Sequence, residues 1–270
     1  MRVVPLSALR RGPSRADPGP VTVALGLGST CFRDPNGITE EDSLNPSTLR
    51  NRKLRQVYLT AWDSLREVLE RDERCSAPYL AWVHADYERT ARRVVVVGKE
   101  TSGWGDRSRV LRMSAKDAVE DLQHKYRRFR LGTEYSGKQS YWVPAHELYR
   151  RLNPNGPELG FVALNVAKVD VGGKPPPREF REALTKPNLL QRELEILDPH
   201  VVVFHTGPRY DPWLQDEFGD LKIIGDRFYA RLVGKCLPEH SFRTYHPRYL
   251  NYRSARKKVY DRILESVTHD

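Results

Sequence analysis

Residues 92–104 read RRVVVVGKETSGW, and this stretch decides the fold. Four consecutive valines are too apolar for a strand with one face in water, so they predict a short strand buried on both faces, as in a parallel sheet. The chain then becomes small and polar until Trp104. Ligands of open α/β sheets bind just beyond the carboxyl ends of strands, so residues 98–104 are a candidate site. An ordinary loop with solvated Lys99 and Glu100 is the alternative.

Two later segments have the same form, an apolar run that stops at polar residues: residues 161–165 (FVALN) and 200–205 (HVVVFH). Residues 242–247 (FRTYHP) are a fourth candidate strand end, which presents polar groups and then reaches a proline. Helical patterns alternate with these strands, which is typical of βαβ units and a mostly parallel sheet. The predicted helices cover residues 54–72, 81–91, 145–152, 189–197 (opened by a capping box of Asn188 and Gln191) and 252–267. Short strands are predicted at residues 21–27 and 223–224, and residues 105–140 have the least regular pattern.

The composition bounds the class of protein. A chain of 270 residues can bury one sizeable α/β core, and we expect a single domain over residues 21–270 after a flexible basic arm at residues 1–20. A net charge of +10 favours a polyanionic partner. Three widely spaced cysteines fit neither a zinc site nor a disulfide framework and suit the reducing cytoplasm. No apolar run is long enough to span a membrane, and we expect no membrane partner and no metal.

The polar strand ends, taken in order, resemble the motifs of the uracil-DNA glycosylase superfamily. That superfamily has a glycine-led polar motif after its first core strand, an asparagine at the end of a middle strand and a late His-Pro motif. The best local matches are LDPHVVVFHTG at residues 197–207 and TYHPRYL at residues 244–250. Residues 161–177 (FVALNVAKVDVGGKPPP) are similar to the family branch that carries an iron–sulfur cluster. The resemblance covers about residues 92–265.

The resemblance implies an α/β three-layer sandwich with a central, mostly parallel four-stranded sheet, and it implies DNA glycosylase activity. Cleaving an N-glycosidic bond leaves positive charge on the sugar and negative charge on the departing base. Glu100 stands where the superfamily often has its acidic residue, and it would orient the attacking water. His246 matches the motif histidine and would stabilise the departing base, as an oxyanion hole does. The alternatives are a surface glutamate and an imidazole satisfied by its own turn.

Reading and holding the base requires further groups. Asn165 can donate and accept at once, as the pairing edge of a pyrimidine requires, although a turn-closing asparagine is the alternative. Enzymes that act on a base in DNA extrude it and hold it against an aromatic ring. Tyr141, Trp142 and Trp104 are the candidates, and each could instead belong to the core. Tyr141 is favoured because a serine–aromatic segment at this place resembles the stacking element of the family.

The segment after His246 resembles the loop that inserts a wedge into the duplex in this family, and Tyr249 or Leu250 would be that wedge. Residues 243–258 contain six Lys or Arg residues and no acid, which suits phosphate contacts. A second basic run at residues 125–130 (KYRRFR) predicts either a solvated face or further phosphate contacts. The residues expected to contact DNA beside the wedge are Arg243, Arg248, Arg253 and Lys257.

Several residues depart from the family pattern. The cluster-bearing branch has four cysteines and this chain has three, so we expect no iron–sulfur cluster and no other cofactor. Lys99 follows the first glycine and Arg248 takes the place of the usual serine, so neither motif matches a common branch. Small residues at Ser102 and Gly103, with the insert at residues 105–140, leave room for a base bulkier than uracil, such as a hypermodified phage cytosine.

The sequence therefore predicts a monomeric, monofunctional DNA glycosylase that excises uracil or a hypermodified pyrimidine in DNA repair or antiviral defence. Lys99 and Lys168 lie close enough to the predicted site to leave lyase chemistry open. The alternative function is a non-catalytic protein that binds modified or abasic DNA with the same pocket. A nucleotide-processing enzyme is disfavoured, because neither a Walker nor a Rossmann glycine loop occurs.

Overall fold

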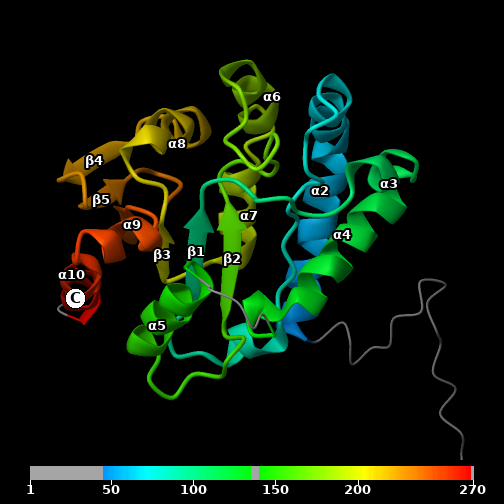
Figure 1. The fold of residues 1–270 in the computed structure, drawn as a ribbon. Coiled ribbons are helices and arrows are strands. Elements are labelled where there is room, and N and C mark those ends of the chain that lie inside the picture. The colour runs from blue at the N-terminus through cyan, green and yellow to red at the C-terminus, as the bar shows by residue number, and fades with distance from the viewer. Residues whose placement is uncertain (1–44, 135–139, 269–270) are drawn as a thin grey trace, which may run out of the picture. The chain divides into compact units, whose positions relative to one another are not determined.

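The computed structural model describes residues 45–134 and 140–268 (Figure 1). The predicted arm at residues 1–20 and the predicted strand at residues 21–27 lie outside the described residues. The described strands form one six-stranded sheet in the order β2-β1-β3-β6-β5-β4. The protein is an α/β protein with a mostly parallel sheet, as the alternation of strands and helices predicts.

The parallel part of the sheet consists of the four principal predicted strands. β1 (Val94–Gly98) lies between β2 (Phe161–Asn165) and β3 (Val201–Phe204), and β3 also pairs with β6 (His240–Thr244). All three pairings are parallel. The four valines of β1 are completely buried, which confirms a strand covered on both faces. The carboxyl ends of the four strands therefore meet at one edge of the sheet.

Two antiparallel strands extend the sheet, so the expected count of four strands is wrong. β4 (Lys222–Gly225) contains the short strand predicted there, and β5 (Tyr229–Val233) pairs with both β4 and β6. Asp226 closes the turn between β4 and β5, because its carboxylate accepts from the amides of Phe228 and Tyr229 at 2.7 and 2.9 Å.

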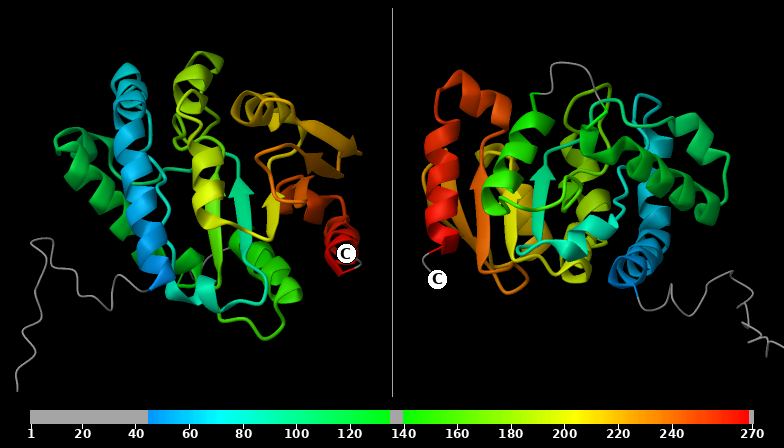
Figure 2. Two further views of the ribbon diagram at one scale, coloured as in Figure 1. Left: turned by 180° about the vertical axis from the view of Figure 1, so that it is seen from behind. Right: turned by 90° about the horizontal axis from the view of Figure 1, so that it is seen from below.

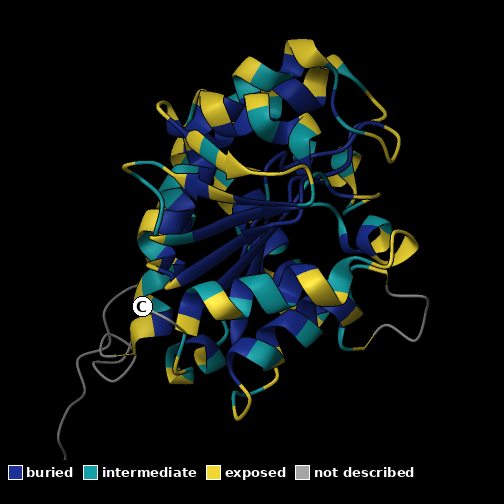
Figure 3. Ribbon diagram, turned by 90° about the vertical axis from the view of Figure 1, so that its left-hand side faces the viewer, coloured by how far each residue is buried: buried dark blue, intermediate teal, exposed yellow. Residues whose placement is uncertain are grey.

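Helices cover both faces of the sheet, which makes the sheet the middle one of three layers (Figures 2 and 3). α5 (Trp142–Leu152) and α10 (Arg256–Thr268) pack against each other on one face, and α7 (Leu189–Leu197) lies on the other face beside α2 (Pro46–Arg71). The other described helices are α3 (Arg107–Leu111), α4 (Ala115–Phe129), α6 (Arg181–Thr185), α8 (Asp211–Phe218) and α9 (Pro247–Tyr252), with 3₁₀ turns at Ala85–Arg89, Arg130–Gly132, Arg178–Phe180 and Pro208–Tyr210.

The segment at residues 105–140 is more regular than the sequence pattern predicts, since α3 and α4 occupy much of its described part. The Ser114 hydroxyl caps α4 by accepting from the amide of Asp117 at 3.2 Å. Val119 and Tyr126 lie on the buried side of α4, and the Tyr126 hydroxyl donates to a β2 carbonyl at 3.2 Å. α4 was missed in the sequence pattern because its many charged residues outnumber those on its narrow apolar side.

Residues 81–91 form a 3₁₀ turn only at Ala85–Arg89, so the predicted helix is wrong. Side chains hold the preceding backbone instead. The amide of Asn51 in α2 donates to the carbonyl of Val83 at 2.9 Å and accepts from the Val83 N–H at 2.7 Å. These bonds satisfy backbone groups that a helix would otherwise pair, so the segment crosses the core in an extended form.

α7 has the predicted bounds, but the predicted capping box is wrong. Asn188 has a φ of 48° and makes no side-chain cap bond. Glu217 in α8 supplies the acceptor instead, because its carboxylate lies 3.0 Å from the amide nitrogen of Gln191. The predicted C-terminal helix at residues 252–267 is α10, which begins four residues later than predicted. The preceding helix α9 was not predicted, and Ser254 with a φ of 51° lies between the two.

Candidate active site

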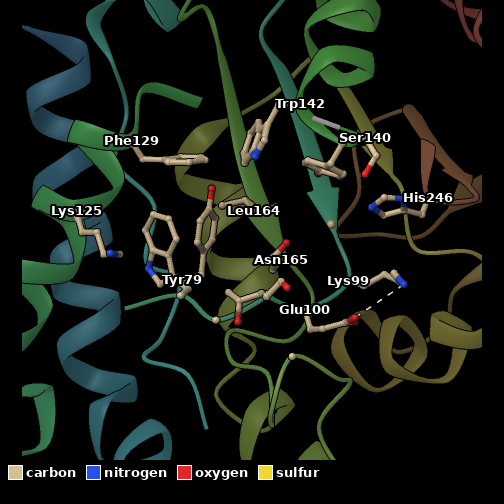
Figure 4. Close-up of a pocket in the computed structure, with 18 of the residues that line it drawn as sticks. Tyr79, Lys99, Glu100, Lys125, Phe129, Ser140, Trp142, Leu164, Asn165 and His246 are labelled. Carbon is tan, nitrogen blue, oxygen red and sulfur yellow. Dashed lines mark ion pairs between the residues drawn. The ribbon is translucent and has the colours of Figure 1, made fainter. Parts of the chain in front are cut away.

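A cavity of about 920 Å³ opens at the carboxyl ends of β1 and β2 (Figure 4). All of residues 98–104 line it, so this segment forms a concave wall and not a plain solvated loop. Six predicted site residues from separate parts of the chain also meet there: Glu100, Trp104, Tyr141, Trp142, Asn165 and His246.

Asn165 reaches the cavity past Gly98, its partner in β1. A Cβ on residue 98 would lie 2.3 Å from Oδ1 of Asn165 and 3.3 Å from the hydroxyl oxygen of Tyr141. Only glycine therefore allows this approach. The strand pairing continues beyond Asn165, since the amide of Ala167 donates to the carbonyl of Lys99 at 2.8 Å. Asn165 therefore lies where the backbone is still paired on both sides of it along the chain.

Glu100 is the one acidic residue among the described residues that line the cavity. Its side chain is 11% exposed, and Nζ of Lys99 lies 3.9 Å from Oε1. Oε2 accepts from the hydroxyl of Tyr210, a buried residue in the 3₁₀ turn after β3. Burial, together with the charge of Glu100, raises the pKa of Tyr210 above its ordinary value, so this hydroxyl keeps its proton and donates.

Tyr210 was not among the predicted site residues. The signal for it is indirect: the Gly207-Pro208 turn follows a predicted strand, and so brings the next few residues to the edge of the sheet where Glu100 lies.

His246 faces the cavity as a neutral hydrogen-bond donor. Its Nδ1 accepts from the amide of Arg248 at 3.2 Å, at the start of α9. A nitrogen that accepts carries no proton, so the proton of the neutral ring is on Nε2. Burial, and then the charges of Lys99 and Arg248, lower the pKa of His246 to about 4. The alternative prediction, an imidazole whose hydrogen bonds are made within its own turn, explains the bond at Nδ1 but does not use the Nε2–H.

A buried carboxylate that was not predicted anchors the loop after Glu100. Oδ2 of Asp170 accepts from the hydroxyl of Thr101 and from the amide of Gly103, the latter at 2.9 Å. Oδ1 accepts from the amide of Gly173 at 2.7 Å. The sequence signal is an aspartate before two glycines, a combination that favours a turn. That pattern does not reveal that the same carboxylate also holds the motif loop.

Six aromatic rings follow one another along the cavity, and we call them the aromatic row. Each ring centroid lies 4.8–5.4 Å from the next, in the order Tyr79, Trp104, Phe129, Trp142, Tyr141 and His246. Of the three predicted stacking residues, Tyr141 is the one beside His246, at 5.4 Å. Trp104 belongs to the far end with Tyr79 and Phe129, which were not predicted.

The basic run at residues 125–130 is divided between the cavity and the outer surface of α4. Lys125 and Arg128 line the cavity, with Nζ of Lys125 5.0 Å from the centroid of a Trp104 ring. Arg127 instead lies over Trp82, 5.5 Å from the ring centroid. Arg127 thus lies on a solvated face, the first predicted alternative, whereas the phosphate contacts of the second stay a prediction.

Arg243 and Leu250 are not placed for their predicted roles. The Arg243 guanidinium is buried, donates to the carbonyl of Arg227 at 2.8 Å and lies 3.3 Å from the carboxylate of Asp211, so it is not available to a phosphate. Leu250 is 0% exposed, because it lies on the inner side of α9, and so it is not an exposed wedge.

The other residues predicted to contact DNA lie at the surface. Arg248, Arg253 and Lys257 are exposed. Tyr249 is partly exposed and packs on Tyr245, with their ring centroids 4.4 Å apart. Tyr252, which was not predicted, is 81% exposed.

Lys168 does not face the cavity as a nucleophile would. Its ammonium group is buried, pairs with the buried carboxylate of Glu193 and donates to the carbonyl of Asn165 at 2.9 Å. Lys168 therefore supports the end of β2 from behind. Lys99 lines the cavity, as predicted.

In the part of the chain that the structure describes, no three His, Cys, Asp or Glu side chains are grouped as a metal site would require. Cys75 and Cys236 are free thiols. None of the helices at residues 45–134 and 140–268 is long and apolar enough to cross a membrane. No family model matches the chain, and no curated protein matches it.

Proposed function

We propose that this chain is a monofunctional DNA glycosylase of the uracil-DNA glycosylase superfamily. It would extrude uracil or a modified pyrimidine from DNA and hydrolyse the N-glycosidic bond. The observation that supports the proposal is the convergence of Glu100, Asn165 and His246 on one cavity at the carboxyl edge of the parallel strands. In this proposal the strands β2-β1-β3-β6 correspond to the four-stranded sheet of the superfamily, and β4 and β5 are an addition.

Glu100 would orient the water that attacks C1′ of the deoxyribose. Tyr210 occupies Oε2, which leaves Oε1 to accept from the water. The water oxygen bonds to C1′ as the C1′–N bond breaks; the electrons of that bond pass to the base, and a water proton passes to the carboxylate or to solvent. The negative charge of Glu100 also offsets the positive charge that develops on the sugar.

His246 and Asn165 would act on the base. The Nε2–H of His246 would donate to the carbonyl oxygen on which negative charge develops, in the manner of an oxyanion hole. A pKa near 4 keeps this ring neutral at physiological pH, so it stabilises charge as a hydrogen-bond donor. The amide of Asn165 would donate and accept along the pairing edge, while the Tyr141 ring stacks on the base.

The partner would be DNA bound by one copy of the chain. A base inside a duplex is stacked and paired, so it reaches a concave site only after extrusion. The net charge of +10 and the exposed Arg248, Arg253 and Lys257 suit contacts with phosphates on either side of the extruded nucleotide.

A base-release assay tests the proposal. The protein is incubated with a duplex that contains uracil and with DNA of a phage that carries modified cytosines, and alkali then converts abasic sites into strand breaks. We expect breaks in at least one of these DNAs. Glu100→Gln should lower the rate about a hundredfold or more, since it removes the carboxylate charge, and should leave the Kd for the same DNA nearly unchanged.

Glu239→Gln is the matched control, because Glu239 is an exposed carboxylate that pairs with Arg231 at 3.2 Å and lies outside the cavity. It should behave as the wild type does. Tight binding without abasic sites in either DNA would favour the non-catalytic DNA-binding protein. Full activity of Glu100→Gln would remove Glu100 from the mechanism.

A further inference from the structure

The cavity is larger than a single pyrimidine needs. Its volume of about 920 Å³ is near the upper end of the range that encloses a whole drug-sized ligand, roughly 300–1,000 Å³. The aromatic row extends over five successive ring contacts, whereas a pyrimidine is one ring. Figure 4 shows His246 and Lys99 at one end, Asn165 and Glu100 in the middle, and Lys125, Phe129 and Tyr79 at the other end, which we call the distal end.

The distal end differs chemically from the end at which His246 and Lys99 lie. Its walls are aromatic, with Trp104 in edge-to-face contact with both Tyr79 and Phe129. Lys125 stands beside these rings, with its Nζ 5.0 Å from the centroid of a Trp104 ring, and Arg128, on the same helix, also lines the cavity. Among the described residues that line the cavity, the carboxylate of Glu100 is the one acidic group. Such a surface accepts a group that has an apolar face and that also presents oxygen atoms as hydrogen-bond acceptors.

The geometry of a pyrimidine connects the two ends. Around the ring, the carbonyl next to the glycosidic nitrogen is followed by the pairing edge and then by the 5-position. Across the cavity, His246 is followed by Asn165 and then by the distal end. A pyrimidine whose carbonyl meets His246 and whose pairing edge meets Asn165 therefore turns its 5-position toward Lys125.

We propose that the distal end binds a bulky substituent on the 5-position of the extruded pyrimidine, one with an apolar face against Trp104 and Phe129 and with acceptor oxygens toward Lys125 and Arg128. This inference rests on the proposed glycosylase function. A sugar hydroxyl and a carboxylate share this chemistry. An unsubstituted uracil would leave the distal end filled with water, so the enzyme would discriminate in favour of the larger base.

The test compares base release from duplexes that differ only in the 5-substituent: none, hydroxymethyl, a hexose joined through hydroxymethyl, and a carboxyl-bearing chain. For the wild type we expect kcat/KM to be at least tenfold higher on one of the two bulky bases than on the unsubstituted base. For the double variant Lys125→Ala/Arg128→Ala we expect the ratio of these two values to fall roughly tenfold or more, as hydrogen bonds to charged groups are lost.

Arg127→Ala is the matched control, because this residue is on the same helix but lies over Trp82 and outside the cavity. It should leave the ratio unchanged. If the double variant does not fold, Arg128→Ala alone serves, since Arg128 is exposed. A wild-type preference for the unsubstituted base would overturn the inference. An equal loss of kcat/KM on all bases in the double variant would also overturn it, and would make Lys125 and Arg128 phosphate contacts. No base release from any duplex would instead refute the proposed function.

Discussion

Replacing Tyr210 with phenylalanine removes one oxygen atom, the one that donates to Oε2 of Glu100. Tyr210 is 2% exposed, so water does not easily take the place of the lost hydroxyl. A hydrogen bond to a charged group contributes about 1.5–3 kcal/mol. If the transition state needs the carboxylate in its present position, this energy corresponds to a rate that is roughly 10 to 150 times lower.

The measurement is single-turnover base release together with the Kd for an uncleaved duplex. Tyr210 donates to the carboxylate that we propose orients water, but Tyr210 itself does not line the cavity. The rate should therefore fall while the Kd stays within about threefold. Tyr149→Phe is the control: the Tyr149 hydroxyl is buried and has no hydrogen-bond partner among the described residues, so its loss should cost neither activity nor stability. A Tyr210→Phe enzyme as fast as the wild type would show that Glu100 does not need this donor, and the reasoning would be wrong.

Three further predictions concern the frame of the site. Gly98→Ala should lower kcat/KM at least tenfold with little loss of secondary structure by circular dichroism, because the new Cβ would lie 2.3 Å from the amide oxygen of Asn165; unchanged activity would show that the amide can move. Lys168→Met should lower the free energy of unfolding by about 3–5 kcal/mol in urea titrations, because it leaves the carboxylate of Glu193 buried without its cation. The double variant Lys168→Met/Glu193→Leu should recover most of this loss, and a double variant no more stable than the single one would contradict the prediction. Burial lowers the pKa of His205 to about 3, so below pH 6.5 the unfolded chain takes up a proton that the folded chain does not, and stability should fall with pH from 6.5 toward 3. Between pH 7 and 5 the free energy of unfolding of the wild type should therefore fall by about 2 kcal/mol more than that of His205→Leu. Equal falls in the two proteins would show that His205 does not cause this pH dependence.

The polar residues at the strand ends could be predicted as site residues from the sequence, because the main strands have a clear hydrophobic pattern. Val94 to Val97 form an uninterrupted apolar run, and only a strand covered on both faces of a sheet accommodates such a run. Parallel strands place their carboxyl ends at one edge. Asn165 ends one of the parallel strands, and Glu100 and His246 each follow another by two residues, so their meeting in one cavity was predictable from their positions at strand ends.

The direction of individual side chains was not predictable in the same way. Arg243 and Leu250 lie in a basic segment that suggests a DNA-binding surface, yet both point into the protein. Arg243 does so because its guanidinium pairs with Asp211 and donates to two backbone carbonyls in the turn between β4 and β5. Leu250 does so because residues 247–252 form a helix, which turns one side of the segment toward the core.

The sequence by itself thus determined the strands, the edge of the sheet at which the site lies and three of its principal polar residues. Only the tertiary structure decided which groups support them. Tyr210 meets Glu100 across 110 positions of the chain, and Asp170 meets Thr101 across 69. The physical reason is that strand formation and strand ends depend on local hydrophobic pattern, whereas a buried hydroxyl or carboxylate is placed by partners that become its neighbours only when distant segments pack together.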